Sequence, residues 1–362
     1  MQRGSGHVRL LGGCGRNGQC PIAHAFTNDR ARRIYDGMTA LIEEIVASYF
    51  FDSLPKPIRY LTRDHSRILG TMILRTVAIR LHVLSWAFWA FLMTGSAALA
   101  QSGQFFKASD RADLHYLSAG QGSRTIVFIP GWLMPADVFR HQLVGLSHQY
   151  RVVLLDPRGQ GKSTAQARDM SAARRADDLR DLVQQLKLND FVLVGWSLGV
   201  MEILELMTRH RLPGLKGLVL VDNSIGMGPP PQARLGRRSA RPMQPEPFRQ
   251  YVSEFSRAIF KRPPENSLLE IVERSASQLE PKVAWGLLDK PHNRDYYRQA
   301  VLASSVPLWY AITPRYRTQA EELVQLRPMT SVTIFEDAGH ALFVDSAEQF
   351  NAELVDFLAR LE

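Results

Sequence analysis

The feature that most constrains the fold of this chain is the segment Gly195-Trp196-Ser197-Leu198-Gly199, which joins two apolar runs. The run before it has the composition of a buried strand, and the run after it is apolar on nearly all sides, as a helix packed deeply against a sheet must be. A serine on such a sharp strand-to-helix turn is strained and exposes its hydroxyl, and the two glycines prevent collisions across the turn. The pattern indicates a catalytic nucleophile, Ser197. Its alternative interpretation is a Gly-Ser loop without chemistry.

Short β-branched runs alternate with helical runs throughout residues 101–362. That alternation is typical of a parallel sheet covered by helices, so the predicted fold class is α/β. The predicted strands are residues 125–130, 151–157, 191–195, 214–222, 306–312 and 331–337, and the clearest helices are residues 175–188, 198–207 and 347–361. Between about residues 225 and 304 the strand rhythm stops, and helical runs follow a turn-rich loop. Since a structureless loop of that length is improbable in a compact domain, we expect an inserted helical lid.

A serine hydroxyl is a weak nucleophile and needs a neighbouring base. Three histidines follow Ser197 in the chain. His210 lies at the end of the helix that starts at the serine, too far along it to fold back, and His292 falls in the predicted lid. His340 lies in a loop between the last predicted strand and the closing helix, where a side chain reaches over the carboxyl edge of the sheet. We therefore expect His340 to be the base.

An imidazole base needs a carboxylate that holds its tautomer and stabilises its cation. In chain order, this acid is expected between the serine and the histidine. Asp222 ends a predicted strand and lies at the same sheet edge as Ser197. The alternative is that Asp222 only caps a loop by local hydrogen bonding. Asp337 is a weaker candidate because it is only three residues from His340.

Five segments together carry a resemblance to a known family. Residues 101–362 resemble the α/β-hydrolase family in the segments IPGW, DPRGQGKS, GWSLG, LVLVDNS and DAGHALF. The resemblance implies the α/β-hydrolase fold, a mostly parallel sheet flanked by helices with an inserted helical lid. In most members the acid follows the penultimate strand, where this chain reads ITPRYRTQ and has no carboxylate before Glu321 and Glu322. A minority carries the acid one strand earlier, in the place that Asp222 occupies.

Acyl transfer also needs two backbone N–H groups that bind the oxyanion. The first residue of the helix after the serine, Leu198, is expected to supply one of them. By resemblance, the other is the N–H of Trp132, in the loop after the strand at 125–130. Many relatives have His-Gly where this chain has Pro130-Gly131, but the donor is a backbone group and the glycine is kept.

Together these residues predict a serine hydrolase that cleaves carboxylic esters, including lactones or thioesters, through a Ser197–His340–Asp222 triad and an acyl-enzyme. The expected partner is a small-molecule ester, and neither a cofactor nor a metal is expected. A second hypothesis is a cofactor-free perhydrolase or haloperoxidase-like enzyme, because the surroundings of the serine resemble such members loosely. A third is a hydrolase fold kept as a non-catalytic binding module, against which the Ser–His pair argues.

Residues 156–163, DPRGQGKS, look like the end of a phosphate-binding loop. The first glycine of the pattern G-x-x-x-x-G-K-S would have to stand at position 156, which is an aspartate. We therefore expect a structural loop there rather than a nucleotide site.

The first hundred residues differ in character from the rest. Residues 81–100 are an apolar run without Lys, Arg, Asp or Glu that ends in A-L-A, and two arginines precede it. A basic start, an apolar centre and an A-x-A end are the parts of a secretory signal peptide, here residues 72–100. Uncleaved, the run would be a signal anchor in contact with the membrane, and a buried core helix is the remaining interpretation. Residues 1–71 show no domain-scale pattern and are interpreted as a short cytoplasmic extension or as a stretch not translated in the natural protein.

The net charge of +9 invites a nucleic-acid interpretation, but the charge is unevenly distributed. Residues 1–100 carry 12 Lys and Arg against 6 Asp and Glu, whereas residues 101–362 carry 32 against 29. We therefore expect no nucleic-acid partner for the catalytic region. Both cysteines, Cys14 and Cys20, lie in the first part, and a cysteine-free catalytic region suits an oxidising compartment. The expected location is periplasmic or secreted, or membrane-anchored with the catalytic domain outside the cytoplasm.

Overall fold

The computed structural model describes residues 102–361, apart from residues 164–168, 231–240 and 290. The predicted signal segment at 72–100 and the predicted extension at 1–71 lie outside the described residues. Among the helices of the described part, none is both long and apolar enough to cross a bilayer.

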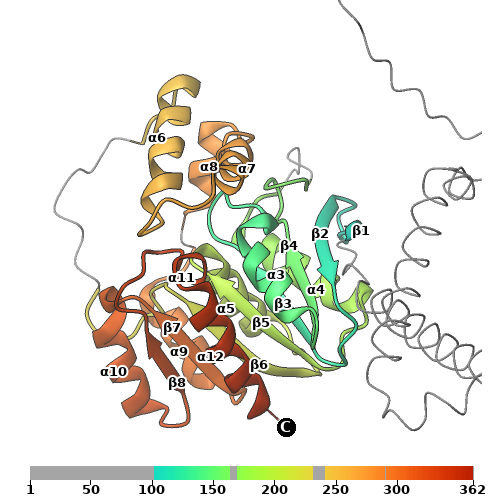
Figure 1. Ribbon diagram of the computed structural model, residues 1–362, viewed down its shortest axis with the longest axis vertical. Helices are drawn as coiled ribbons and strands as arrows, with labels where there is room; N and C mark the ends of the chain where they lie inside the picture. Colours follow the sequence, from blue (N-terminus) through green and yellow to red (C-terminus); the bar gives the residue numbers. More distant parts are fainter. Residues whose placement is uncertain (1–101, 164–168, 231–240, 290, 362) are drawn as a thin grey trace, which may run out of the picture. The chain divides into compact units, whose positions relative to one another are not determined.

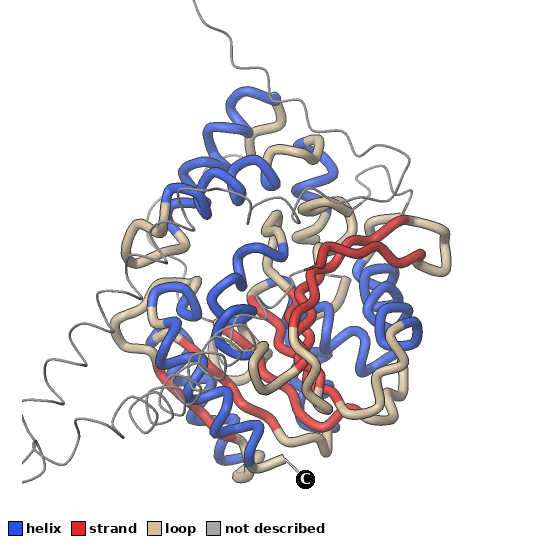
Figure 2. The backbone as a smooth tube through the Cα atoms, turned by 45° about the vertical axis from the view of Figure 1, so that its right-hand side comes forward, coloured by secondary structure: helices blue, strands red, loops and turns tan. Residues whose placement is uncertain are grey.

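Eight strands of the described residues form one sheet, which lies between layers of helices (Figures 1 and 2). Across the sheet the order is β1-β2-β4-β3-β5-β6-β7-β8. β2 runs antiparallel to β1 and to β4, and the other neighbours are parallel. The strands are β1 (Ser102–Lys107), β2 (Asp113–Ala119), β3 (Thr125–Ile129), β4 (Arg151–Leu155), β5 (Phe191–Trp196), β6 (Leu215–Val221), β7 (Leu308–Ile312) and β8 (Ser331–Ile334). The mostly parallel α/β sheet predicted from the sequence is confirmed.

The central strands are continuous apolar runs because both of their faces are buried. Successive side chains of β3 point to opposite faces, so Val127 and Ile129 join one hydrophobic cluster while Ile126 and Phe128 join the other. The first cluster packs under α4 (Ala172–Gln185), α5 (Leu198–Arg209), α9 (Arg294–Ala303) and α10 (Arg317–Leu326). The second packs under α3 (Arg140–Leu146), α11 (Leu342–Asp345) and α12 (Ala347–Ala359).

The sequence did not predict β1 and β2, which lie at one edge of the sheet. Phe105 of β1 is 58% exposed while the neighbouring Phe106 is buried, so this strand contributes only one face to the core. A short, half-exposed strand interrupted by polar residues lacks the apolar run by which the central strands were recognised.

The segment predicted as a lid contains helices with two different packing partners. α6 (Pro245–Ala258), α7 (Asn266–Ala276) and α8 (Pro281–Gly286) share a hydrophobic cluster with Trp132 and gather above the sheet in Figure 1. α9 instead packs against α5 through Tyr297 and Val301, in the cluster under the sheet. We call α6, α7 and α8 the lid helices.

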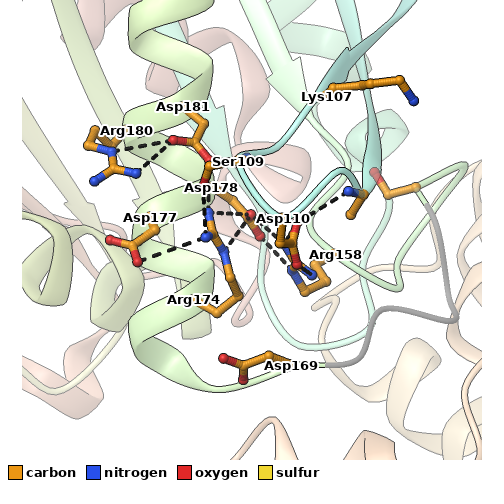
Figure 3. A network of polar contacts seen from close by, with 12 residues as sticks. Lys107, Ser109, Asp110, Arg158, Asp169, Arg174, Asp177, Asp178, Arg180 and Asp181 are labelled. Carbon is orange, nitrogen blue, oxygen red and sulfur yellow. Dashed lines mark hydrogen bonds and ion pairs between the residues drawn. The ribbon is translucent and has the colours of Figure 1, made fainter.

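The loop at 156–163 ties separate segments together. The buried guanidinium of Arg158 pairs with Asp110 at 2.7 Å and with Asp178 at 2.6 Å, and so joins the turn between β1 and β2 to α4 (Figure 3). The carboxylate of Asp156 accepts hydrogen bonds from two backbone N–H groups, at 2.6 and 2.9 Å. The charged side chains of Asp156 and Arg158 are therefore engaged inside the fold, as a structural loop requires.

Candidate active site

Ser197 lies on the turn between β5 and α5 and has φ 54° and ψ −116°. A non-glycine residue with positive φ is strained, and such strain is common where a side chain must be presented to a substrate. A Cβ atom added at Gly195 would lie 2.7 Å from the carbonyl oxygen of Gly199, and one added at Gly199 would lie 2.4 Å from that of Ile129. Only glycine therefore fits two residues before the serine and two residues after it.

Ser197, His340 and Asp222 form a hydrogen-bonded chain of side chains. The distance from Ser197 Oγ to His340 Nε2 is 2.9 Å, and that from His340 Nδ1 to Asp222 Oδ2 is 2.7 Å. Ser197 follows β5, Asp222 follows β6, and His340 follows β8, so three parallel strand ends bring together residues far apart in the sequence. The side chain of His340 is 29% exposed, whereas that of Asp222 is only 3% exposed. The histidine is thus open to a substrate and the carboxylate is shielded from water.

The loop that carries His340 is held from two sides. The indole N–H of Trp196 donates to the carbonyl oxygen of His340 at 2.8 Å, so the residue before the serine also positions the histidine. The backbone N–H of Gly339 donates to the carboxylate of Asp345 at 2.8 Å.

Thr313 holds the second oxygen of Asp222. The backbone N–H and the hydroxyl of Thr313 each donate to Asp222 Oδ1 at 2.7 Å. Thr313 directly follows β7, the place where the sequence shows no carboxylate. The sequence did not single out Thr313. The signal that could have indicated it was a hydrogen-bonding side chain at the end of this strand. Both oxygens of Asp222 are therefore hydrogen-bonded, as a buried carboxylate requires.

The other candidate acids have partners away from His340. Asp337 is 68% exposed and pairs with Lys261 and Arg262. Glu322 pairs with Arg298 and accepts a hydrogen bond from a backbone N–H. Glu321 is exposed on α10.

The other two histidines after the serine are also engaged elsewhere. His210 Nε2 lies 2.5 Å from a carboxylate oxygen of Asp177. His292 stacks on Tyr296 and lies 3.0 Å from a carboxylate oxygen of Glu205.

Two acidic residues of the apolar helix α5 are buried and have polar partners. Glu202 pairs with Arg175 at 2.6 Å, and both side chains are almost completely buried. Burial raises the pKa of Glu202, and the adjacent guanidinium of Arg175 opposes that rise. Glu205 accepts a hydrogen bond from the hydroxyl of Tyr296 at 2.9 Å, which connects α5 to α9.

The two expected oxyanion donors belong to segments that border the serine. Leu198 is the first residue of α5, where a backbone N–H has no partner within the helix. A Cβ atom added at Gly131 would lie 3.0 Å from Ser197 Cβ, so the segment that leads to Trp132 runs directly beside the nucleophile. Within the described residues, no acceptor pairs with the backbone N–H of Trp132 or Leu198. Both groups are therefore available for an oxyanion.

The side chain of Trp132 packs against the lid helices and is hydrogen-bonded to one of them. Its indole N–H donates to the carbonyl oxygen of Ala284 at 2.6 Å. Its ring stacks on Trp285 with a centroid distance of 4.9 Å and meets Phe255 edge-on at 5.2 Å. The backbone segment that holds the expected oxyanion donor is thus fixed by the lid helices.

Two cavities open on Ser197, with volumes of about 470 Å³ and about 120 Å³. Among the described residues, no cluster of His, Cys, Asp and Glu side chains has the arrangement of a metal site. The arrangement around the serine can support nucleophilic attack by Ser197, with His340 as the proton acceptor.

A sheet with parallel strand ends that present a serine turn and a histidine defines an α/β-hydrolase architecture. Residues 126–353 match the model of the alpha/beta hydrolase family, and the chain belongs to that family.

The chain is similar to enzymes of more than one activity. It is 26% identical over 261 residues to N-formylmaleamate deformylase of Pseudomonas putida, a match that covers 67% of this chain and 92% of that enzyme. It is 36% identical over 113 residues to the non-heme chloroperoxidase CPO-A1 of Kitasatospora aureofaciens, which covers 31% of this chain but only 41% of that protein. A solved structure of a putative aryl esterase from Burkholderia cenocepacia has 25% identity and a TM-score of 0.62, and the match covers 71% of this chain and 98% of that one.

Proposed function

We propose that this protein is a serine hydrolase that cleaves small carboxylic esters, including lactones or thioesters, through an acyl-enzyme. The observation that carries the proposal is the hydrogen-bonded chain from Ser197 through His340 to Asp222, with distances of 2.9 and 2.7 Å. The strained serine turn and the two unpaired N–H groups beside it support the same chemistry.

The proposed reaction has two similar halves. His340 Nε2 takes the proton of Ser197 Oγ as this oxygen attacks the acyl carbon, and the N–H groups of Trp132 and Leu198 bind the oxyanion. The C–O bond to the leaving group then breaks, and His340 gives its proton to the departing alcohol. Water, deprotonated by His340, then attacks the acyl carbon. The bond to Ser197 Oγ breaks, His340 returns its proton to this oxygen, and the acid is released. Throughout, the carboxylate of Asp222 stabilises the imidazolium that forms in each half.

An ester panel and an active-site probe test the proposal. The full-length protein should hydrolyse p-nitrophenyl esters and react with a fluorophosphonate at Ser197. Ser197→Ala and His340→Ala should each lower kcat by more than about a thousandfold, because members of such a triad act as a unit. His292→Gln is the matched control, since this histidine pairs with Glu205 instead, and it should keep its activity. A folded protein that neither reacts with the probe nor hydrolyses any ester would support the non-catalytic binding module.

A second candidate is a peroxide-dependent perhydrolase or haloperoxidase-like activity. The local similarity to a non-heme chloroperoxidase favours it as an alternative. Hydrogen peroxide would replace water as the nucleophile that attacks the acyl-enzyme. Peroxide-dependent halogenation that exceeds ester hydrolysis at equal enzyme concentration would favour this second activity.

We also propose that the catalytic region acts outside the cytoplasm, in the periplasm or after secretion. The signal-peptide pattern at 72–100 supports this, and its predicted cleavage point lies two residues before β1 begins at Ser102. N-terminal sequencing of the exported product should give a terminus at about residue 101. A mature terminus well upstream of residue 95 would exclude cleavage and favour a membrane anchor.

A further inference from the structure

The two cavities at Ser197 differ in their walls as well as in their volumes. The larger, of about 470 Å³, is lined on one side by His340 and on another by Arg315. The smaller, of about 120 Å³, does not reach His340 and is lined by Leu198 and Met201 of α5. A substrate centred on Ser197 would therefore extend into two unequal spaces.

The proposed mechanism decides which half of an ester enters each cavity. The leaving oxygen must lie beside His340 Nε2, because it receives its proton from that atom. The leaving portion therefore extends into the larger cavity, on the side of His340. The acyl carbon is held between Ser197 and the oxyanion donors, so its chain extends past Leu198 into the smaller cavity.

The volume of the smaller cavity limits the acyl chain. With about 120 Å³ against about 470 Å³, the smaller cavity has about a quarter of the volume of the larger one, so it matches the shorter half of the substrate. Met201, Leu288 and Tyr297 form large apolar parts of its wall. A short apolar acyl chain matches both the size and the lining.

Arg315 gives the larger cavity a positive charge that has no carboxylate partner among the described residues. Its guanidinium lies over the ring of Tyr316, 5.7 Å from the ring centroid. In the part of the chain that the structure describes, no carboxylate pairs with Arg315, whereas the nearby cation Arg317 pairs with Glu336. The charge on the cavity wall is thus available to an anionic group of a ligand.

We propose that the natural substrate is an ester of a short acyl group with a larger leaving portion that carries a carboxylate or similar anion. This inference rests on the proposed ester hydrolysis and names the substrate class of the same site.

The acyl half is tested with 4-(acyloxymethyl)benzoates that carry acetyl, butyryl and octanoyl groups, on the full-length protein. The kcat/KM for butyryl should exceed that for octanoyl by at least about tenfold, because the smaller cavity favours the shorter chain. Met201→Ala should reduce this ratio by enlarging the smaller cavity. Met207→Ala, on the same helix but outside this cavity, should leave the ratio unchanged. An octanoyl ester hydrolysed as well as the butyryl ester by the parent protein would overturn the proposal.

The charged half of the proposal is tested by comparing 4-(butyryloxymethyl)benzoate, whose carboxylate is remote from the reacting bond, with the corresponding neutral carboxamide. At low salt, Arg315→Gln should lower kcat/KM for the anionic ester by about threefold to fivefold more than for the neutral ester, the range expected of an exposed ion pair. Arg317→Gln, the matched control, should change neither. Equal effects of Arg315→Gln on both esters, or no effect on either, would overturn this half.

The outcomes separate the two proposals. Hydrolysis of neutral and long-chain esters without preference would overturn the substrate class while leaving the proposed ester hydrolysis standing. The absence of any ester hydrolysis, together with an unlabelled Ser197, would overturn both.

Discussion

At the residue scale, Asp222 is held at both of its carboxylate oxygens, by His340 on one and by Thr313 on the other. It has a positive φ of 44°, so the backbone after β6 turns sharply to bring the carboxylate under the histidine. A buried carboxylate with three hydrogen bonds fixes the direction of the imidazole ring.

Replacing the acid tests its assignment. Asp222→Asn keeps the shape of the side chain but removes the charge that stabilises the imidazolium, so kcat should fall by about 10³- to 10⁴-fold. Glu321→Gln is the control, and it should change kcat by less than twofold because its side chain is exposed on α10. Steady-state kinetics on one p-nitrophenyl ester measures both. A large loss of kcat in Glu321→Gln and none in Asp222→Asn would assign the catalytic acid to Glu321 on α10.

Thr313 is expected to act through Asp222. Thr313→Val removes one of the two hydrogen bonds to Asp222 Oδ1, and loss of a bond to a charged group corresponds to a fall in kcat of about tenfold. KM should stay nearly constant, since Thr313 acts on the orientation of the acid. Thr313→Ser should recover most of the loss by restoring the hydroxyl. A change in KM alone, or no rescue by serine, would contradict a positioning role.

At the scale of elements, the lid helices and the loop after β3 are joined by Trp132. The ring of Trp132 packs among aromatic side chains of α6 and α8, while Gly131, the residue before it, lies against Ser197. A shift of the lid helices would therefore move the expected oxyanion donor.

Removing the indole N–H tests this connection. Trp132→Phe loses the hydrogen bond to Ala284 and should lower the free energy of unfolding by about 1 kcal/mol and kcat severalfold. Trp309→Phe is a matched control, because it loses a similar bond to Thr333 on β8, away from the lid helices. The control should lower stability alone. Equal loss of kcat in both variants would show that a general loss of stability causes the effect.

The ion-pair network around Arg158 should make stability depend on pH. The hydrogen bonds from Arg158 lower the pKa of Asp110 from 3.8 to about 2, so this carboxylate stabilises the folded state above pH 3.8 (Figure 3). That stabilisation is lost as the pH falls from 3.8 through about 2, since below both values the carboxyl group is protonated in the folded and in the unfolded chain alike.

Asp110→Asn isolates this contribution. At pH 7 the variant should be less stable than the parent by at most about 1 kcal/mol, because Asp110 is partly exposed. Urea unfolding at several pH values should show the difference shrinking between pH 4 and pH 2. Glu246→Gln removes the exposed pair with Arg249 and serves as a surface control. A difference that stays constant down to pH 2 would contradict the assignment.

At the scale of the whole molecule, the parallel sheet gathers the site. Ser197 and His340 are 143 residues apart in the chain, yet their side chains are in hydrogen-bonding contact. Parallel strands all end at the same edge of the sheet, so the loops after β5, β6, β7 and β8 converge there. That convergence is why residues at predicted strand ends could be assigned to one site before their distances were known.

The features that the sequence determined by itself are those set by local chemistry. The apolar runs predicted the central strands because a strand buried on both faces must be apolar throughout. The glycines around Ser197 predicted the turn because a side chain at either position would collide with a backbone carbonyl. The edge strand β1 escaped prediction because it buries only one face, and β2 escaped because polar residues interrupt its buried run.

Only the tertiary structure decided which distant groups meet. It joined Thr313 to Asp222, Arg175 to Glu202 and Trp132 to the lid helices, and it left Arg315 on the wall of a cavity. None of these contacts has a signature in local sequence, because each depends on how loops from separate strands pack over the sheet edge. The turn that presents the serine is thus a local property of the chain, while the acid's support and the shape of the substrate cavities follow from long-range packing.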